Sequence, residues 1–116
     1  MSPRTLIISA AVAVGMTAGA PAAATAKGCG QSRSLGASYV TNISAKGVSC
    51  GKAKDVVRAF NTCRRDNGGA DGRCNRRVSG FKCTETDRDT SPVQVTAAVS
   101  CKDGGKRVKF RYSQFT

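Results

Sequence analysis

Residues 93–112 read VQVTAAVSCKDGGKRVKFRY and give the clearest indication of the fold. Apolar and polar residues alternate on both sides of an Asp-Gly-Gly segment, a pattern typical of two antiparallel strands joined by a tight turn. We therefore predict strands over 93–101 and 106–112. Side chains two residues apart lie on the same face of a strand. The residues predicted on the inner, apolar face are Val93, Val95, Ala97, Val99, Cys101, Val108, Phe110 and Tyr112.

A single amphipathic helix is predicted upstream of this hairpin. Ser49 can cap its N-terminus, and apolar residues then recur at helical spacing. These residues are Ala53, Val56, Val57, Phe60 and Cys63. Strands are also predicted at 39–43 and 78–83, which gives the order β-α-β-β-β. The expected fold is an α+β domain with one helix packed on a small, mostly antiparallel sheet.

Three segments rich in glycine or polar residues are predicted to be irregular. Residues 27–38 form a Gly- and Ser-rich arm, 64–77 (RRDNGGADGRCNRR) a basic loop, and 84–92 (TETDRDTSP) a hairpin loop. Glu85, Asp87 and Asp89 in the last segment are expected to be solvated. They match neither the positioned carboxylate pair of a glycosidase nor a calcium loop.

The N-terminal 26 residues have the features of a secretory signal peptide. Arg4 is their only charged residue, and an apolar core over 6–14 is followed by small residues that offer a cleavage site. A transmembrane anchor is the alternative, but Pro21 and the many alanines make the second half of the segment only weakly hydrophobic. We expect cleavage after Ala26, leaving a single secreted domain, 27–116, without a transmembrane anchor.

Six cysteines follow this segment, and an even number in an exported protein predicts disulfides. If strands and helix simply alternate in direction, Cys50 and Cys83 lie at one end of the sheet and the other four cysteines at the opposite end. Bridged cysteines need Cα atoms within about 7 Å. The pairing predicted is Cys50 with Cys83, Cys63 with Cys74, and Cys29 with Cys101. Zinc is not expected, because there is no histidine and no Cys-x-x-Cys pair.

Three motifs resemble a group of small exported, cysteine-containing proteins from high-GC actinobacteria. They are VSCGKAKDVVRAF, SGFKC and VSCKDGGKRVKFRY, and the similarity covers roughly residues 40–112. The group shares a Val-Ser-Cys helix start, a Gly-Phe/Trp-x-Cys strand and a closing basic strand. Cys29, Cys63 and Cys74 are additional to its usual cysteines. The group has no established activity, so the resemblance implies only a fold.

The composition argues against an enzyme. Without histidine there is no Ser-His or Cys-His pair, and no histidine-based ribonuclease chemistry. Cys50 at a helix start would be an activated thiolate if it were free, but we expect it to be paired. No cofactor is predicted.

The chain is strongly basic, with 19 Lys and Arg against 7 Asp and Glu, a formal charge of +12. Such a charge favours polyanionic partners. Strand alternation places Arg107, Lys109 and Arg111 in line, with Lys82 on the same outward face. The candidate anion-binding residues are Lys82, Arg107, Lys109, Arg111, Arg64, Arg65, Arg76 and Arg77. The alternative is that these Lys and Arg side chains have no binding role: they are solvated and only prevent the strand from pairing with other strands.

The predicted function is that of a small secreted binding protein, monomeric and without catalytic activity. Its partner would be an anionic polymer, a lipid surface or an acidic protein. Sequence-specific nucleic-acid binding is not expected, because no aromatic residue joins the predicted basic face. Two alternatives stay open. One is an inhibitor of an extracellular hydrolase that uses the loop between Cys63 and Cys74; the other, less favoured, is a cationic membrane-active toxin.

Overall fold

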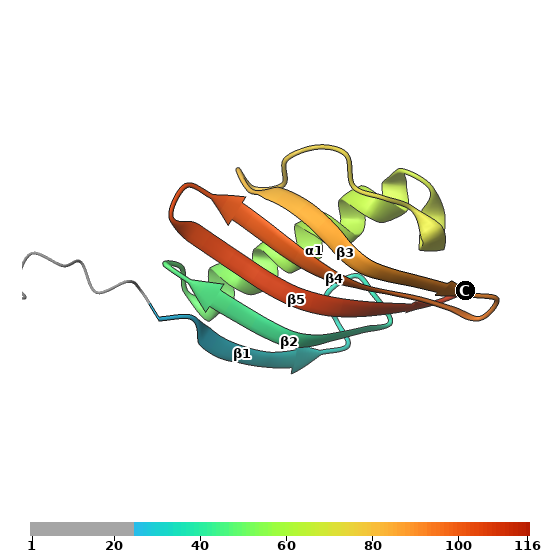
Figure 1. The fold of residues 1–116 in the computed structure, drawn as a ribbon, viewed down its shortest axis with the longest axis horizontal. Helices are drawn as coiled ribbons and strands as arrows, with labels where there is room; N and C mark the ends of the chain where they lie inside the picture. The colour runs from blue at the N-terminus through green and yellow to red at the C-terminus, as the bar shows by residue number, and fades with distance from the viewer. Residues whose placement is uncertain (1–24) are drawn as a thin grey trace, which may run out of the picture.

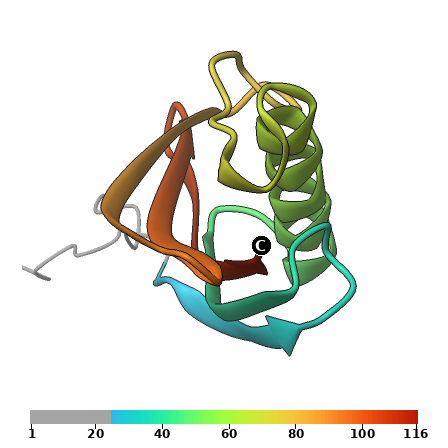
Figure 2. The ribbon, with the colours of Figure 1, turned by 90° about the vertical axis from the view of Figure 1, so that its right-hand side faces the viewer.

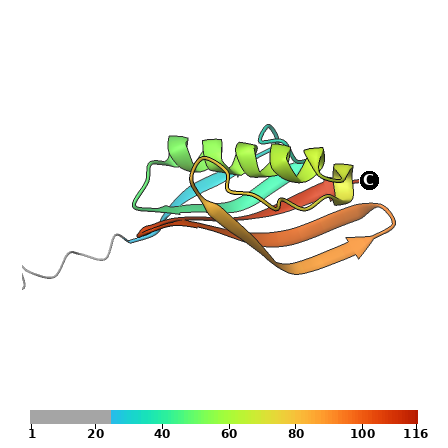
Figure 3. The same ribbon diagram turned by 90° about the horizontal axis from the view of Figure 1, so that it is seen from above.

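The computed structural model describes residues 25–116; the predicted signal peptide lies outside them, apart from its last two residues. The elements are β1 (Lys27–Ser32), β2 (Tyr39–Lys46), α1 (Cys50–Asp66), the 3-10 turn η2 (Gly69–Asp71), β3 (Lys82–Ser91), β4 (Gln94–Asp103) and β5 (Lys106–Phe115). The strands form one antiparallel sheet in the order β1-β2-β5-β4-β3. The helix lies on one face of this sheet (Figure 1, Figure 3). The α+β class, with one helix and three disulfides, is confirmed.

The helix begins and packs as its sequence predicts. The Oγ of Ser49 accepts a hydrogen bond from the backbone N–H of Lys52 at 3.1 Å and so caps the first turn. All five residues of the predicted apolar stripe are buried. Phe60 stands edge-on to Phe110 of β5, with ring centroids 5.5 Å apart, a favoured aromatic geometry. The core therefore lies between α1 and the inner face of the sheet.

The β4–β5 hairpin also matches its prediction. Asp103 pairs with Lys106 across a turn in which Gly104 has φ +58°, a conformation that costs glycine least. The predicted inner residues from Val95 to Cys101 and from Val108 to Tyr112 are buried. Val93 was expected with them but is 68% exposed. It lies in the turn between β3 and β4, where strand alternation no longer applies.

Two segments predicted to be irregular are strands. Residues 27–32 form the edge strand β1, so the sheet has five strands and not four. Residues 84–91, predicted as a loop, belong to β3 at the opposite edge. Edge strands carry polar side chains and bulges that discourage further pairing, and β3 has both, with Asp87 at φ +51° where its register shifts. Its polar sequence therefore resembles that of a loop.

The disulfides correct two of the three predicted pairs. Cys63 with Cys74 is confirmed, but Cys29 pairs with Cys50 and Cys83 with Cys101. The predictions Cys50 with Cys83 and Cys29 with Cys101 are wrong because the directions of the elements were misassigned. The chain after α1 returns along the molecule as a loop before β3 begins, and β1 runs antiparallel to β2. Four cysteines thus share one end of the sheet, where Cys83 and Cys101 are cross-strand partners.

Candidate anion-binding face

The sheet face opposite α1 carries cations from four adjacent strands. Lys46 of β2 pairs with Arg107 of β5, Arg107 also pairs with Lys102 of β4, and Lys102 pairs with Lys82 of β3. Directly paired residues lie on the same face of a sheet. We call these four residues, Lys46, Arg107, Lys102 and Lys82, the basic row. Neighbouring strands are about 4.8 Å apart, so the row crosses about 14 Å of the sheet.

A second line of cations runs along the central strand β5. Arg107, Lys109 and Arg111 alternate with the buried residues Val108, Phe110 and Tyr112, as predicted. Lys109 and Arg111 are exposed, whereas Arg107 is partly buried among its neighbours in the row. The basic row together with Lys109 and Arg111 is the basic face.

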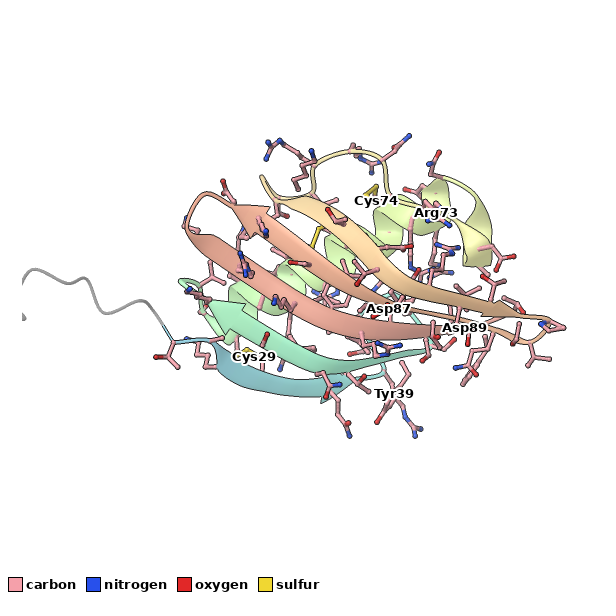
Figure 4. All side chains as sticks on the ribbon, viewed as in Figure 1. Cys29, Tyr39, Arg73, Cys74, Asp87 and Asp89 are labelled. Atoms are coloured by element: carbon pink, nitrogen blue, oxygen red, sulfur yellow. A yellow bond between two sulfur atoms is a disulfide. The ribbon has the colours of Figure 1, made fainter. Side chains whose placement is uncertain are left out.

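No acid neutralises these cations. Within residues 25–116, the ion pairs join Arg58 to Asp55 and Arg73 and Arg88 to Glu85, and none includes a residue of the basic face. Asp89 of β3 pairs with Thr96 of β4, toward the end of the sheet opposite Lys82, and Figure 4 shows Asp87 and Asp89 in that half of the molecule. The positive potential of the row is thus left to solvent and to partners.

The surface between the basic row and the far end of the sheet is lined by small, mostly polar side chains. Ser44 and Ser100 flank Lys109, and Thr41 and Ala98 flank Arg111. A shallow hollow of about 380 Å³ lies here, with Asn42, Ser44, Ser100 and Thr86 among its lining residues. Hydroxyl and amide groups can both donate and accept hydrogen bonds, so this surface can pair with polar groups as well as with charges.

The other predicted anion-binding residues do not join this face. Arg64 is fully buried, so its prediction as a binding residue is wrong. Arg65 is exposed on the helix and donates to the carbonyl of Gly36 at 3.1 Å. Arg76 and Arg77 line a hollow with residues of α1, on the helix side of the molecule. The structure therefore brings together Lys82, Arg107, Lys109 and Arg111 and separates the four loop and helix arginines from them.

Sequence reasoning missed two members of the row, Lys46 and Lys102. Lys46 lies beyond the predicted end of its strand, and Lys102 was assigned to the turn. The hairpin itself held a usable signal for the second residue. A two-residue turn at Gly104 and Gly105 places Lys102 opposite Arg107.

The buried Arg64 belongs to a polar cluster under the loop that follows α1. Its guanidinium donates to Asn61 at 2.8 Å, to Gln114 at 2.9 Å and to the carbonyl of Ala70 at 3.2 Å, and lies 4.2 Å from the ring centroid of Tyr112. Burial lowers the pKa of Arg64, but this side chain keeps its charge at any physiological pH. The cluster is a structural support and not an open site.

Glu85 completes this cluster from β3. Its carboxylate accepts from the Tyr112 hydroxyl at 2.6 Å and from Arg88 at 2.7 Å, and its side chain is 9% exposed. The prediction that Glu85 is solvated is therefore wrong. Burial and the hydrogen bond to Glu85 raise the pKa of Tyr112 well above its ordinary value of 10.0.

The loop between Cys63 and Cys74 is compact, and buried and partly buried side chains beneath it hold its backbone. The carbonyls of Ala70 and Asp71 accept hydrogen bonds from Arg64 and Arg88. Gly72 packs so closely on the carbonyl of Arg64 that a Cβ would lie 1.8 Å from its oxygen. Figure 4 shows Arg73 and Cys74 beside the end of α1. A protease inhibitor needs a projecting, extended loop, so this arrangement does not favour that alternative.

Comparisons with protein-family models, curated proteins and solved structures found no match. The resemblance to exported actinobacterial proteins stays a prediction. Within residues 25–116, no helix has the length and apolar character needed to cross a membrane. The same residues contain no cluster of three or more His, Cys, Asp or Glu side chains placed to hold a metal ion.

Proposed function

We propose that this protein is a secreted, non-catalytic binding module that holds an anionic polymer of the cell envelope or its surroundings on the basic face. The observation that carries the proposal is the basic row, in which strand pairing brings together Lys46, Arg107, Lys102 and Lys82 without an acidic partner. Cations on several strands can contact successive charges of one polymer, and release of its counterions favours binding.

The stability cost of the basic row supports a binding role. Like charges directly opposite each other on neighbouring strands destabilise a sheet, by up to about 1 kcal/mol a pair. The row contains three such pairs, and none of its four positions is occupied by an acidic residue. Local arrangements that oppose folding stability concentrate at functional sites.

The shape of the sheet favours a flexible polymer over a flat lipid surface. The sheet is strongly twisted, so its β1 and β3 edges do not lie in one plane (Figure 2). A linear chain can follow such a surface, whereas a bilayer contacts only part of it. The exposed apolar residues Val93 and Phe115 lie at the opposite end of the strands from the basic row, so the row itself offers no apolar anchor to a membrane.

The proposal predicts that charge reversal on β5 strongly weakens binding. The variant carrying Arg107→Glu, Lys109→Glu and Arg111→Glu is expected to bind inorganic polyphosphate at least about 100-fold more weakly than the wild type at 50 mM salt. The reason is that each cation near an anionic surface contributes about 1 kcal/mol. The affinity of the wild type should fall steeply with salt. A plot of log affinity against log salt concentration should be less steep for the variant, by the amount expected for the loss of about three contacts between cations and the polymer.

A control variant of equal net charge carries Lys52→Glu, Lys54→Glu and Arg76→Glu on the helix side. Acids near the start of a helix are favourable to its dipole, so this variant should remain folded. It is expected to retain most of the wild-type affinity. Equal loss of affinity in both variants would show that total charge alone governs binding and would overturn the proposed face. Stronger binding to anionic vesicles than to polyphosphate would favour a lipid surface instead.

A further inference from the structure

A second hollow lies on the same sheet face, at the opposite end of the strands from the basic row. It has a volume of about 500 Å³ and is lined by Arg33, Ser38, Tyr39, Gln94, Ser113 and Phe115. Tyr39 pairs with Ser113 of β5, and Phe115 pairs with Gln94 of β4. Figure 4 shows Tyr39 at the other end of the sheet from Cys29. The face therefore has a basic end and an aromatic end.

The aromatic end is held in place although it is exposed. Phe115 is 62% exposed, yet its backbone N–H donates to the Oγ of Ser38 at 3.0 Å. The next residue is also fixed, because the N–H of Thr116 donates to the carbonyl of Val93 at 3.0 Å. The guanidinium of Arg33 lies 5.6 Å from the centroid of the Tyr39 ring. A fixed backbone at an aromatic residue reduces the entropy that is lost when a partner covers its side chain.

The two ends belong to one continuous surface. Phe115 lies eight positions after Arg107 along β5, which corresponds to about 27 Å of extended strand. The outward residues between them are Lys109, Arg111 and Ser113. Arg111 thus lies between the basic row and the aromatic hollow, and no buried residue of β5 interrupts the path.

We propose that the hollow binds a sugar ring of an anionic polysaccharide whose acidic groups lie along the basic face. This inference rests on the proposed function and names its partner. The C–H faces of a sugar ring pack on aromatic side chains, and its hydroxyls can pair with Ser113, Gln94 and the Thr and Ser groups of the middle of the face. Arg33 lines the hollow, and Arg111 lies two residues before Ser113 on the same outward face of β5, so these are the cations we expect to meet a carboxylate on such a ring.

The composition of the middle of the face favours a polysaccharide over a single-stranded nucleic acid. Proteins that bind single strands stack successive bases on several aromatic side chains. The aromatic residues on this face are confined to the hollow, and the outward positions beside Lys109 and Arg111 are Ser44, Ser100, Thr41 and Ala98. Hydroxyl groups, which can both donate and accept, suit the hydroxyl groups of sugars.

The test compares three polyanions at matched charge: a polygalacturonate oligosaccharide, inorganic polyphosphate and the oligonucleotide dT20. The oxidised protein with Phe115→Ala is expected to bind polygalacturonate about 10-fold more weakly and polyphosphate with unchanged affinity, because polyphosphate has no sugar rings. Phe115→Tyr should retain wild-type binding. Tyr39→Leu serves as an independent variant. Because Tyr39 is half-buried, the folding of this variant is checked by thermal melting, and it too should bind polygalacturonate more weakly and polyphosphate with unchanged affinity.

The outcomes separate this inference from the proposed function. If Phe115→Ala and Tyr39→Leu leave polygalacturonate binding unchanged, or weaken both polymers equally, the sugar site is wrong while the basic face stands. If the β5 charge reversal leaves polyphosphate binding intact, the proposed function itself fails. Tighter binding to dT20 than to polygalacturonate, with a larger loss in Phe115→Ala, would replace the polysaccharide by a nucleic acid.

Discussion

Arg64 and Arg65 are adjacent in the sequence, yet only one of them is available to a partner. Arg64 is fully buried and Arg65 is exposed. The helical spacing of the apolar residues distinguishes the two arginines. Ala53, Val57 and Phe60 lie on the buried side of the helix, and continuing their spacing by one turn places Arg64 on the same side. The sequence prediction failed here because it ended the helix at Cys63 and treated both arginines as loop residues.

Tyr112 makes the stability of this protein sensitive to alkaline pH. Its pKa is raised in the folded state, so the folded protein retains a proton that the unfolded chain releases above pH 10. The unfolded state then binds fewer protons, and stability falls as pH rises. The contribution of Tyr112 is therefore complete below pH 10 and is lost above it.

The expected effect can be measured against Tyr112→Phe. In urea denaturation the wild type should lose about 1.4 kcal/mol of unfolding free energy per pH unit above pH 10, relative to the variant. Near neutral pH the wild type should be more stable by about 1 kcal/mol, because the variant lacks the hydrogen bond to Glu85. Parallel stability curves for the two proteins between pH 8 and pH 11.5 would contradict this assignment.

Among the elements, those with strong periodicity were predictable and the two sheet edges were not. The helix and the β4–β5 hairpin have alternating or helical apolar patterns because one side of each contacts the core. β1 and β3 pair on one side only, and neither has a fully buried residue. Each pairs with the next strand along the chain, β1 with β2 and β3 with β4, but with no buried face neither carries the apolar alternation that identifies a strand in the sequence.

The basic row predicts opposite effects of one substitution on stability and on binding. Lys102 lies between Arg107 and Lys82, so Lys102→Glu replaces two repulsive contacts by two attractive ones. The free energy of unfolding is expected to rise by about 1 kcal/mol at low salt, and the gain should shrink as salt screens the charges. Polyphosphate affinity should fall about 10-fold.

Arg76→Glu provides the matched control for Lys102→Glu. It makes the same change in net charge at an exposed position on the helix side, so both stability and affinity should change little. Thermal melting and polyphosphate titration of the two variants give the comparison. Destabilisation by Lys102→Glu would mean that the row does not strain the sheet.

For the whole molecule, the even number of cysteines correctly predicted disulfides, but only one of the three predicted pairs was right. The shortest loop, Cys63 with Cys74, was predictable because these residues flank one turn at the end of α1. The other four cysteines lie at the same end of the sheet, so their pairing follows from strand order. That order depends on β1 and on the long return before β3, the two features that the sequence prediction lacked.

Trypsin offers a direct test of this pairing, because each cysteine falls on a different tryptic peptide. Without reduction, we expect peptide 28–33 joined to 47–52, 59–64 joined to 74–76, and 83–88 joined to 89–102. Digestion at the lowest workable pH limits thiol exchange, and mass spectrometry identifies the pairs. A linkage of 28–33 to 89–102 would contradict the strand order described here.

The central position of β5 also determines when the protein can fold. β5 is the last of the five strands in chain order, yet β2 and β4 both pair with it and not with each other. The sheet cannot form until residues 106–115 are available, and contacts between distant segments slow folding. A chain threaded through an export channel would thus stay open until its final strand emerged, and fold on the far side.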